Sequence, residues 1–438
     1  MSKKNPLTYL YIFCIVLLFK TTSAQQKLSL NESIQIGLEN NYSIKIAKNQ
    51  ESVSEETRKA ALSTILPRVD ANAGLSQSIN DTRQVFVTGG INERDAAKTA
   101  TQNANVLMTW TLFDGLKMFA AYDKLKELEK LGEVNTKAML QSVVADIIIN
   151  YYAIVAAQEQ MKASKEALEV SKSRLTIAEN KSKVGSGSTL DLLNAKVDYN
   201  ADYSTYLKQQ ETLKNLKIRF NELLILPIDN SFELIDTIPQ ANVLDLTGMY
   251  TRLKDQNPQL ISAKSRQRIA ELNIKEVAAD RYPTLRLNSG YNFNNQNAEA
   301  GFFIENRTQG FNYGVTASFN IFNGLLQSKR EKIARIESQT AEMDFLSTKQ
   351  NLEANWNALI TSYQNNLTLL QLEGENQQIS KRNLEISNDK YKLGGISSFQ
   401  LREAQRSYIE ANSRFVNALY QYKLAETSLL ELAGDLVK

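Results

Sequence analysis

The stretch FNYGVTASFNIFNG, residues 311–324, decides the fold, because its apolar and polar residues alternate. Every second position from its start is apolar: Phe311, Tyr313, Val315, Ala317, Phe319 and Ile321. This period of two is typical of a β-strand with one apolar and one polar face. The roughly hundred residues that follow have a helical pattern, so the strand needs partners from elsewhere in the chain.

The chain contains two copies of one plan, and the second copy of each element supplies candidate partners. ILPRVDANAG recurs 216 residues later as RYPTLRLNSG. VLMTWTLFDGL, residues 106–116, recurs as VTASFNIFNGL, residues 315–325, and VGSGSTLDLLNA, residues 184–195, recurs as LGGISSFQLREA, residues 393–404, both at an offset of 209 residues. Each half therefore has the same plan of a helix, two strands and a long helical hairpin.

Alternation predicts four strands, at about 69–79, 104–113, 284–294 and 311–322. Each run has about ten residues, which is the length that a tilted strand needs to cross a bilayer. The segments within each strand pair, around 80–103 and 295–310, are polar and predict external loops.

The same alternation also occurs in a soluble β-sandwich, in which the apolar faces of two sheets meet. Four strands are few for such a core, and the apolar faces carry aromatic residues toward the strand ends, where membrane barrels place their aromatic girdles. We therefore interpret six aromatic residues as lipid-facing: Trp110, Tyr291, Phe293, Phe311, Tyr313 and Phe319.

Four strands cannot close into a barrel, and an open sheet edge in hydrocarbon would leave N–H and C=O groups without partners. Several chains must therefore pool their strands. Two chains would give eight strands and an interior filled by side chains, whereas three chains give twelve strands with room for an aqueous lumen. The pattern favours a homotrimer that shares one barrel.

Residues 116–184 contain no Pro and predict one helix of some 65 residues, about 100 Å long. Apolar residues recur at spacings of three and four, which suits coiled-coil packing. Glycines mark the turns of the two hairpins, at 184–188 and 393–398. Together with the export signal described next, such a long helical hairpin indicates that this part of the protein lies in the periplasm of a Gram-negative cell.

Residues 1–24 have the pattern of a secretory signal peptide: lysines, an apolar run and small residues at a cleavage site. A retained membrane anchor is the weaker alternative, because the apolar run is short for a span. Cys14, the single cysteine, lies within this run, so the mature chain is expected to have no disulfide. The chain has no His, and removal of Lys3, Lys4 and Lys20 takes the formal charge from +3 to about zero, so neither His-based catalysis nor nucleic-acid binding is expected.

The domain organisation that follows has a signal peptide at 1–24, a first repeat at 25–229, an equatorial linker at 230–245 and a second repeat at 246–438. The predicted fold class is an internally duplicated α+β membrane protein. Its four strands join a trimeric 12-stranded outer-membrane β-barrel, and its hairpins form a long α-helical coiled-coil barrel.

The chain resembles the outer-membrane efflux proteins of the TolC family. The resemblance rests on the doubled plan together with the stretches WTLFDG and VGSGSTLDLLNAKVDY. The resemblance covers essentially the whole mature chain. It implies a homotrimer in the cell outer membrane, in contact with outer-membrane lipid, whose helical barrel lies in the periplasm. The implied function is that of an exit duct of a tripartite efflux pump or type I secretion system, exporting drugs, small molecules or proteins.

The resemblance also implies two protein partners, a periplasmic adaptor (membrane fusion) protein and an inner-membrane pump of the RND, ABC or MFS type. No cofactor, metal or catalytic residue is implied, since the duct performs no chemistry. The alternative is a periplasmic adaptor or scaffold protein with helical hairpins. That class would need β-rich lipoyl-like segments around a single hairpin, and this chain has two hairpins.

In the family the hairpin turns dock the adaptor and close the periplasmic end. The matched docking residues are Val184, Gly185, Leu190, Leu192, Leu393, Gly394, Phe399 and Leu401. Asp191, Gln400 and Glu403 are the matched candidates for a periplasmic gate. Relatives often have an Arg and two acids at the second turn, whereas this chain has Ile396, Gln400 and Glu403, so a salt-bridged latch is not expected. Three copies of Glu403 and Asp191 could still line a narrow anionic mouth.

Overall fold

The computed structural model describes residues 26–239 and 244–437. The predicted signal peptide, residues 1–24, lies outside the described residues, as does a small part of the predicted linker. The chain forms two compact units, and each unit draws segments from both predicted repeats. Unit 1 comprises Met1–Ile46, Ala138–Asn257 and Asn351–Lys438, and unit 2 comprises Ala47–Lys137 and Pro258–Gln350.

The long helices confirm the internal duplication. Helices α4 (Lys117–Lys183) and α8 (Leu326–Lys392) each have 67 residues, and α5 (Thr189–Leu224) and α9 (Ser398–Ala433) each have 36. Each of the two long helices of the second repeat begins and ends 209 residues after its counterpart, the offset found in the sequence for the hairpins. Residue n of the first hairpin therefore has residue n + 209 of the second hairpin as its counterpart.

Shorter helices precede the strands in each repeat. The first repeat has α2 (Leu30–Asn40), α3 (Tyr42–Ala61) and the short 3₁₀ helix η1 (Leu62–Thr64). The second repeat has α6 (Leu246–Gln256), α7 (Pro258–Ala278) and η2 (Ala279–Arg281). Ser29 begins α2 with a capping box, in which its hydroxyl accepts from the Glu32 backbone N–H while the Glu32 carboxylate accepts from the Ser29 N–H.

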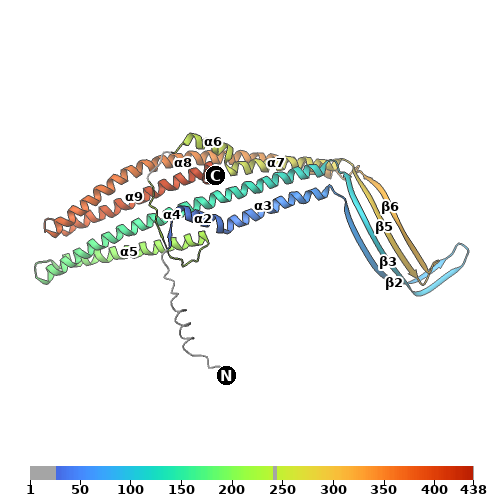
Figure 1. Ribbon diagram of the computed structural model, residues 1–438, viewed down its shortest axis with the longest axis horizontal. Helices are drawn as coiled ribbons and strands as arrows, with labels where there is room; N and C mark the ends of the chain where they lie inside the picture. Colours follow the sequence, from blue (N-terminus) through green and yellow to red (C-terminus); the bar gives the residue numbers. More distant parts are fainter. Residues whose placement is uncertain (1–25, 240–243, 438) are drawn as a thin grey trace, which may run out of the picture. The chain divides into compact units, whose positions relative to one another are not determined.

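Unit 2 contains the predicted strands in one antiparallel sheet of order β2-β3-β5-β6, seen side by side in Figure 1. The strands are β2 (Arg68–Val85), β3 (Ile91–Phe113), β5 (Thr284–Ala298) and β6 (Glu305–Ser318). The sheet thus joins one strand pair from each repeat through the β3–β5 contact.

The prediction of an irregular loop at 80–103 is wrong, because most of these residues continue β2 and β3 to a short turn around Gly89. The external position of this segment stays a prediction. At a register shift in this extension, the Ala96 N–H donates to Asp81 Oδ1 at 2.8 Å. Polar side chains occupy both faces of the extension, so the backbone pairing continues without the alternation that would reveal it.

The predicted end of the last strand at residue 322 is also wrong. Strand β6 ends at Ser318, which pairs with Thr284, the first residue of β5. Beyond this pair β5 offers no further backbone partner, so Phe319 follows the strand.

Unit 1 holds the apolar core of the helices. In the first repeat the core contains a helical stripe of α4, the end of α5 and the segment that follows it: Val143, Ile147, Tyr151, Ile154, Val155, Phe220, Leu224 and Phe232. In the second repeat a matching cluster contains Met249, Leu253, Trp356, Tyr363, Tyr422 and Leu429. The α4 stripe makes this helix apolar enough to cross a membrane by composition, and half of that stretch is buried within the protein.

A two-stranded parallel sheet, β1 (Gln26–Leu28) with β4 (Phe232–Leu234), joins the N-terminal segment to the linker in unit 1. The Tyr151 hydroxyl donates to the Leu28 carbonyl at 3.2 Å and lies 3.0 Å from Asp236 Oδ2, which also accepts from the Leu30 N–H at 2.8 Å. Burial raises the pKa of the Tyr151 phenol. Strands of three residues carry no alternation signal, so the sequence did not predict this pair.

Candidate functional site

The register of the sheet in unit 2 brings the apolar residues of all four strands onto one face. Four rows cross the strands: Trp110, Leu287 and Val315; Val69, Met108, Ser289 and Tyr313; Ala71, Val106, Tyr291 and Phe311; Ala73, Ala104, Phe293 and Gln309. Five of the six predicted lipid-facing aromatic residues share this face, and the sixth, Phe319, lies beyond the strand. Tyr313 is 80% exposed and Phe311 is 67% exposed.

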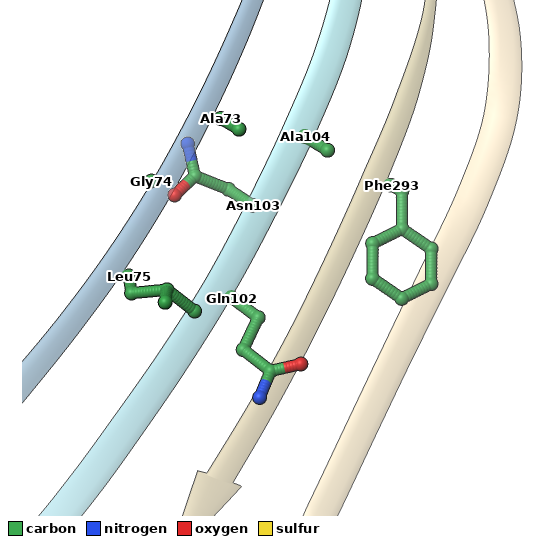
Figure 2. Close-up of a pocket in the computed structure, with 7 residues that line it drawn as sticks. All are labelled: Ala73, Gly74, Leu75, Gln102, Asn103, Ala104 and Phe293. Atoms are coloured by element: carbon green, nitrogen blue, oxygen red, sulfur yellow. The ribbon is translucent and has the colours of Figure 1, made fainter. Parts of the chain in front are cut away.

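The apolar face has a hollow where two small side chains lie beside a large aromatic one. Ala73 and Ala104 leave a space beside the Phe293 ring, bordered by Leu75 and Gln102 (Figure 2). An exposed aromatic surface of this extent is unusual for a soluble monomer and is expected of a face that contacts lipid or another protein.

The opposite face is polar and rich in Asn. Its central rows contain Asn72, Asn105, Asn292 and Gly310; Gly74, Asn103, Asn294 and Thr308; Ser76, Thr101, Gln296 and Asn306. Asn72 Nδ2 donates to Asn105 Oδ1 at 2.9 Å, and Asn292 Nδ2 donates to Asn312 Oδ1 at 2.7 Å. These three rows carry no charged residue, so this face offers water a neutral, hydrogen-bonding wall.

Asn103 of this wall lies over Gly74, as Figure 2 also shows. A Cβ atom at Gly74 would lie 2.6 Å from Asn103 Oδ1, so only Gly allows this side-chain position. Toward the strand ends that join the helices the polar face carries charged residues, and there Arg68 Nε is 2.9 Å from Asp70 Oδ2.

The sheet has two open edges. Within the part of the chain that the structure describes, β2 and β6 each have one neighbouring strand, and every residue of β6 is exposed. The free N–H and C=O groups of such edges have no partner in hydrocarbon. A two-faced sheet with open edges is therefore suited to a membrane only when strands of other chains complete it.

The first hairpin tip, in unit 1, has an apolar and exposed surface. Gly185 has a φ of +71°, the left-handed conformation that favours Gly. Val184 is 77% exposed and Leu190 is 65% exposed, while Leu192 is half-buried. The Ser188 hydroxyl accepts from the Leu190 N–H at 3.2 Å and caps α5.

The second hairpin tip has the same plan. Gly394 has a φ of +75°, and Leu393 and Phe399 are exposed. The inclusion of Leu401 among the docking residues needs correction, because Leu401 is only 1% exposed. It belongs to the tip cluster, which we define as Leu384, Tyr391, Leu401, Ala404 and Tyr408.

The three predicted gate residues have different surroundings. Gln400 completes a capping box at the start of α9, where its Oε1 accepts from the Ser397 N–H at 2.9 Å. Asp191 Oδ1 lies 3.5 Å from the Ser398 hydroxyl, a contact between the two hairpins. Glu403 is exposed. Whether Asp191 and Glu403 face a lumen stays a prediction.

A buried polar cluster between the hairpins was missed by the sequence analysis. Gln405 Nε2, on α9, donates to the Ala167 carbonyl at 2.7 Å and to the Ser171 hydroxyl at 2.9 Å. Arg402 donates to Asp202 Oδ2 at 2.7 Å, and Arg174 pairs with Asp198. Polar residues at helical spacing are typical of a solvated helix face, so no sequence signal indicates that these residues are covered by the other hairpin.

Comparison with known proteins agrees with this geometry. The outer membrane efflux protein family model matches residues 33–224 and 249–435, one segment for each repeat. The two-faced sheet and the paired hairpins define an outer-membrane channel. The chain belongs to the outer membrane efflux protein family and has its localisation, the cell outer membrane. In this family three chains contribute four strands each to one barrel, which continues as a helical barrel.

A curated relative, outer membrane protein TolC of Vibrio cholerae, is 20% identical over 438 residues, which cover 97% of this chain and 95% of TolC. The probable outer membrane lipoprotein SilC of Salmonella typhimurium is 19% identical over 393 residues, or 87% of this chain and 83% of SilC. The Campylobacter jejuni CmeC outer membrane channel has a TM-score of 0.80 at 18% identity, covering 93% of this chain and 85% of CmeC. At this identity the structural likeness shows the fold.

These findings exclude the scaffold alternative and the enzyme class, since the family consists of outer-membrane channels. Among the residues that the structure describes, no group of three or more His, Cys, Asp or Glu side chains could hold a metal ion.

Proposed function

We propose that three copies of this chain form the exit duct of a tripartite efflux pump or a type I secretion system. The observation that carries this proposal is the two-faced sheet with open edges. Strand β6 of one copy would pair with β2 of the next, which satisfies both edges and closes twelve strands into a barrel.

The height of the apolar face supports a membrane location. From Leu285 to Phe293, β5 advances about 26 Å along its axis. A strand tilt of 35–45° reduces this to a height of about 20 Å, which is close to the apolar band of about 25 Å on outer-membrane barrels. The neutral Asn-rich wall would then face the lumen and would favour neither cations nor anions. This supports a passage for chemically varied drugs, small molecules or proteins.

We further propose that the exposed tip residues dock a periplasmic adaptor, which connects the duct to an inner-membrane pump of the RND, ABC or MFS type. Val184, Leu190, Leu393 and Phe399 supply apolar contacts, and Gly185 and Gly394 supply the turns. Half-buried Leu192 supports the first tip. Asp191 and Glu403 remain our candidates for an anionic ring near the mouth of the tunnel.

The oligomeric mass of the detergent-extracted protein tests the duct. We expect a β-rich species of three chains that separates into single chains only after boiling. A protein that leaves the membrane in carbonate as a single chain would contradict the proposal. To test the cargo route, pumps of the RND, ABC and MFS types are each co-expressed with their adaptors in cells that lack other outer-membrane ducts, and drug accumulation is compared with and without this chain.

A further inference from the structure

The apolar face of the sheet changes character toward the strand ends that do not join helices. Three more rows follow the row of Phe293: Leu75, Gln102, Asn295 and Arg307; Gln77, Ala100, Asn297 and Glu305; Ile79 and Lys98. Apolar side chains thus give way to amides and charges. In a membrane barrel such a change lies at the depth of the lipid headgroups, just beyond the apolar band.

Small side chains leave two hollows along this part of the face. The first is the hollow beside the Phe293 ring in Figure 2, and its volume is about 430 Å³. The second lies farther from the helices, has a volume of about 410 Å³ and is lined in part by Lys98 and Ala100. On this face of β3 only Gln102 separates Ala104 of the first hollow from Ala100 of the second. The two hollows therefore follow one strand from the apolar band to the charged rows.

Two cations lie along these hollows. The Arg307 guanidinium lies over the Phe293 ring, with its Cζ atom 5.2 Å from the ring centre. Lys98 lines the second hollow, and the side chains of Arg307 and Lys98 are both exposed. The ion pairs that the described residues form at this end of the sheet involve neither of them: Arg83 with Glu93, and Arg94 with Glu299. Two cations are therefore available to an anion.

The acids nearby do not cancel these two charges. Glu299 lies 3.7 Å from Arg94, and its Oε2 atom accepts from the Lys98 backbone N–H at 3.2 Å. Glu305, in the row between those of Arg307 and Lys98, supplies one negative charge. The three outer rows thus carry two positive charges and one negative charge, and this excess favours an anionic group.

Asn295 contributes an acceptor without a partner. Its Oδ1 atom is buried, and no group among the described residues donates a hydrogen bond to it. Asn295 pairs with Arg307 across β5 and β6, so this acceptor and a cation belong to one row. An unpaired buried acceptor is unfavourable and indicates a donor that the chain does not supply. The row therefore suits a headgroup that has hydroxyl or amide N–H groups as well as phosphate.

We propose that this face of each chain binds one acylated sugar phosphate, the lipid class of the outer leaflet of the outer membrane. Its phosphate groups bind Arg307 and Lys98, and a sugar hydroxyl or amide N–H donates to Asn295 Oδ1. One acyl chain lies in the first hollow, against Ala104 and Phe293. This inference rests on the proposed barrel, since the face meets lipid only when the strands close.

The position and the amides favour a sugar lipid over a glycerol lipid. Because the helical barrel of the family lies in the periplasm, the strand ends that do not join helices lie on the side of the outer leaflet. Gln102, Asn295 and Asn297 occupy the rows between the apolar band and Lys98. A sugar offers hydroxyl groups to all of these amides, whereas a glycerol phosphate offers few.

Lipid binding to the purified trimer tests this site. The trimer is stripped of lipid in mild detergent, and binding is measured by native mass spectrometry with three probes: diphosphorylated lipid A, lipid A without phosphate, and phosphatidylglycerol. We expect one diphosphorylated lipid A per chain, bound at least about tenfold more tightly than either of the other two lipids, because only this probe offers both phosphate and sugar.

Arg307→Gln should weaken the binding of diphosphorylated lipid A about tenfold and leave the binding of lipid A without phosphate unchanged. The matched control is Arg286→Gln, which removes an exposed cation from the polar face of the same sheet, in the row of Thr111 and Thr316. It should change neither affinity. Equal losses from Arg307→Gln and Arg286→Gln would show a general charge effect and would overturn the site.

A second pair of variants tests the acyl position. Ala104→Phe fills the first hollow and should lower the binding of diphosphorylated lipid A, whereas Ala71→Phe adds the same ring to the same face outside the hollow and should not. Both positions are exposed, so neither ring is forced into a packed core. Full lipid binding by Ala104→Phe would remove the hollow from the site.

The outcomes separate the lipid site from the duct. If the native trimer binds phosphatidylglycerol as tightly as diphosphorylated lipid A, the face is a general lipid contact, so the site is wrong and the duct stands. If the native protein is itself a single chain, the barrel fails and the lipid site fails with it.

Discussion

Ile225 and Gly434 occupy the same position in the two repeats and share the left-handed backbone conformation, with φ angles of +57° and +79°. Each residue follows the last helix of its hairpin and donates its N–H to carbonyls of the final turn. The second repeat uses Gly, which adopts this conformation freely, whereas the first repeat places a β-branched residue there. The termination of the helix by backbone hydrogen bonds therefore outweighs the local strain at Ile225.

This relationship predicts the effect of Gly434→Ala. A Cβ atom at Gly434 would lie 3.5 Å from the Gln256 carbonyl oxygen, an ordinary contact, so the substitution adds only the strain of the left-handed conformation. We expect the free energy of unfolding to fall by about 1–2 kcal/mol, measured by denaturant titration of the helical circular dichroism signal. A loss above about 4 kcal/mol would indicate an unrelated packing defect.

Gly115 provides a sterically different case. It has a φ of +75°, and a Cβ atom there would lie 2.3 Å from the Ala279 carbonyl oxygen. Gly115→Ala should therefore lower stability by about 1–3 kcal/mol beyond the backbone strain, seen as a lower yield of folded protein in the outer membrane. The control is Gly89→Ala, where φ is +81° and no atom lies within 4 Å of the added Cβ. Equal yields from the two variants would show that the backbone around Gly115 and Ala279 can shift to make room for the added Cβ atom.

Two neighbouring tip residues should respond differently to substitution. Leu401 is buried in the tip cluster, so Leu401→Ala should lower the free energy of unfolding by about 2–4 kcal/mol. Phe399 is 77% exposed, so Phe399→Ser should leave thermal stability unchanged and weaken adaptor binding, measured on purified components. Full adaptor affinity of Phe399→Ser would remove this residue from the proposed docking surface.

Glu431 predicts a pH dependence. The pKa of the Glu431 carboxyl is raised above its ordinary value of 4.5. Burial is the larger cause, and the negative charge of Asp146 is the smaller one. The folded chain then holds this proton more tightly than the unfolded chain does. The stability contribution of the protonated group is fully present below pH 4.5 and is lost as the pH rises through the raised pKa.

We therefore expect Glu431→Gln to raise the thermal unfolding temperature at neutral pH and to have little effect below pH 4.5. Parallel pH profiles of parent and Glu431→Gln would contradict the assigned pKa direction.

Much of the architecture could be predicted because it rests on periodic patterns. Alternation located the four strands, and the 209-residue offset of Val184 and Leu393 located the two hairpins. The apolar side of the sheet followed from the same alternation, and the register places Tyr291 and Phe311 in one row.

The remaining features depend on contacts between distant segments. The β1–β4 pair is too short for a pattern, and Asp236 meets Tyr151 only in the folded chain. Leu401 resembled its exposed neighbour Phe399 in sequence, but its position on α9 turns it toward α4. Gln405 is buried and Arg402 is half-buried because the other hairpin covers them, and the sequence pattern of a single helix does not show which other helix lies against it.

The unequal length of the two strand hairpins has a consequence at the cell surface. Strand β3 pairs with β5 only from Thr99 onward, so residues 80–98 form a ribbon that extends beyond the backbone pairing of the second hairpin. The ribbon contacts the loop between β5 and β6, where Arg94 donates to the Glu299 carbonyl at 2.6 Å. In an assembly of three copies, three long ribbons alternate with three short loops around the rim. An antibody or bacteriophage that approaches from the medium would meet these ribbons first, and their sequence would define the antigenic face of the protein.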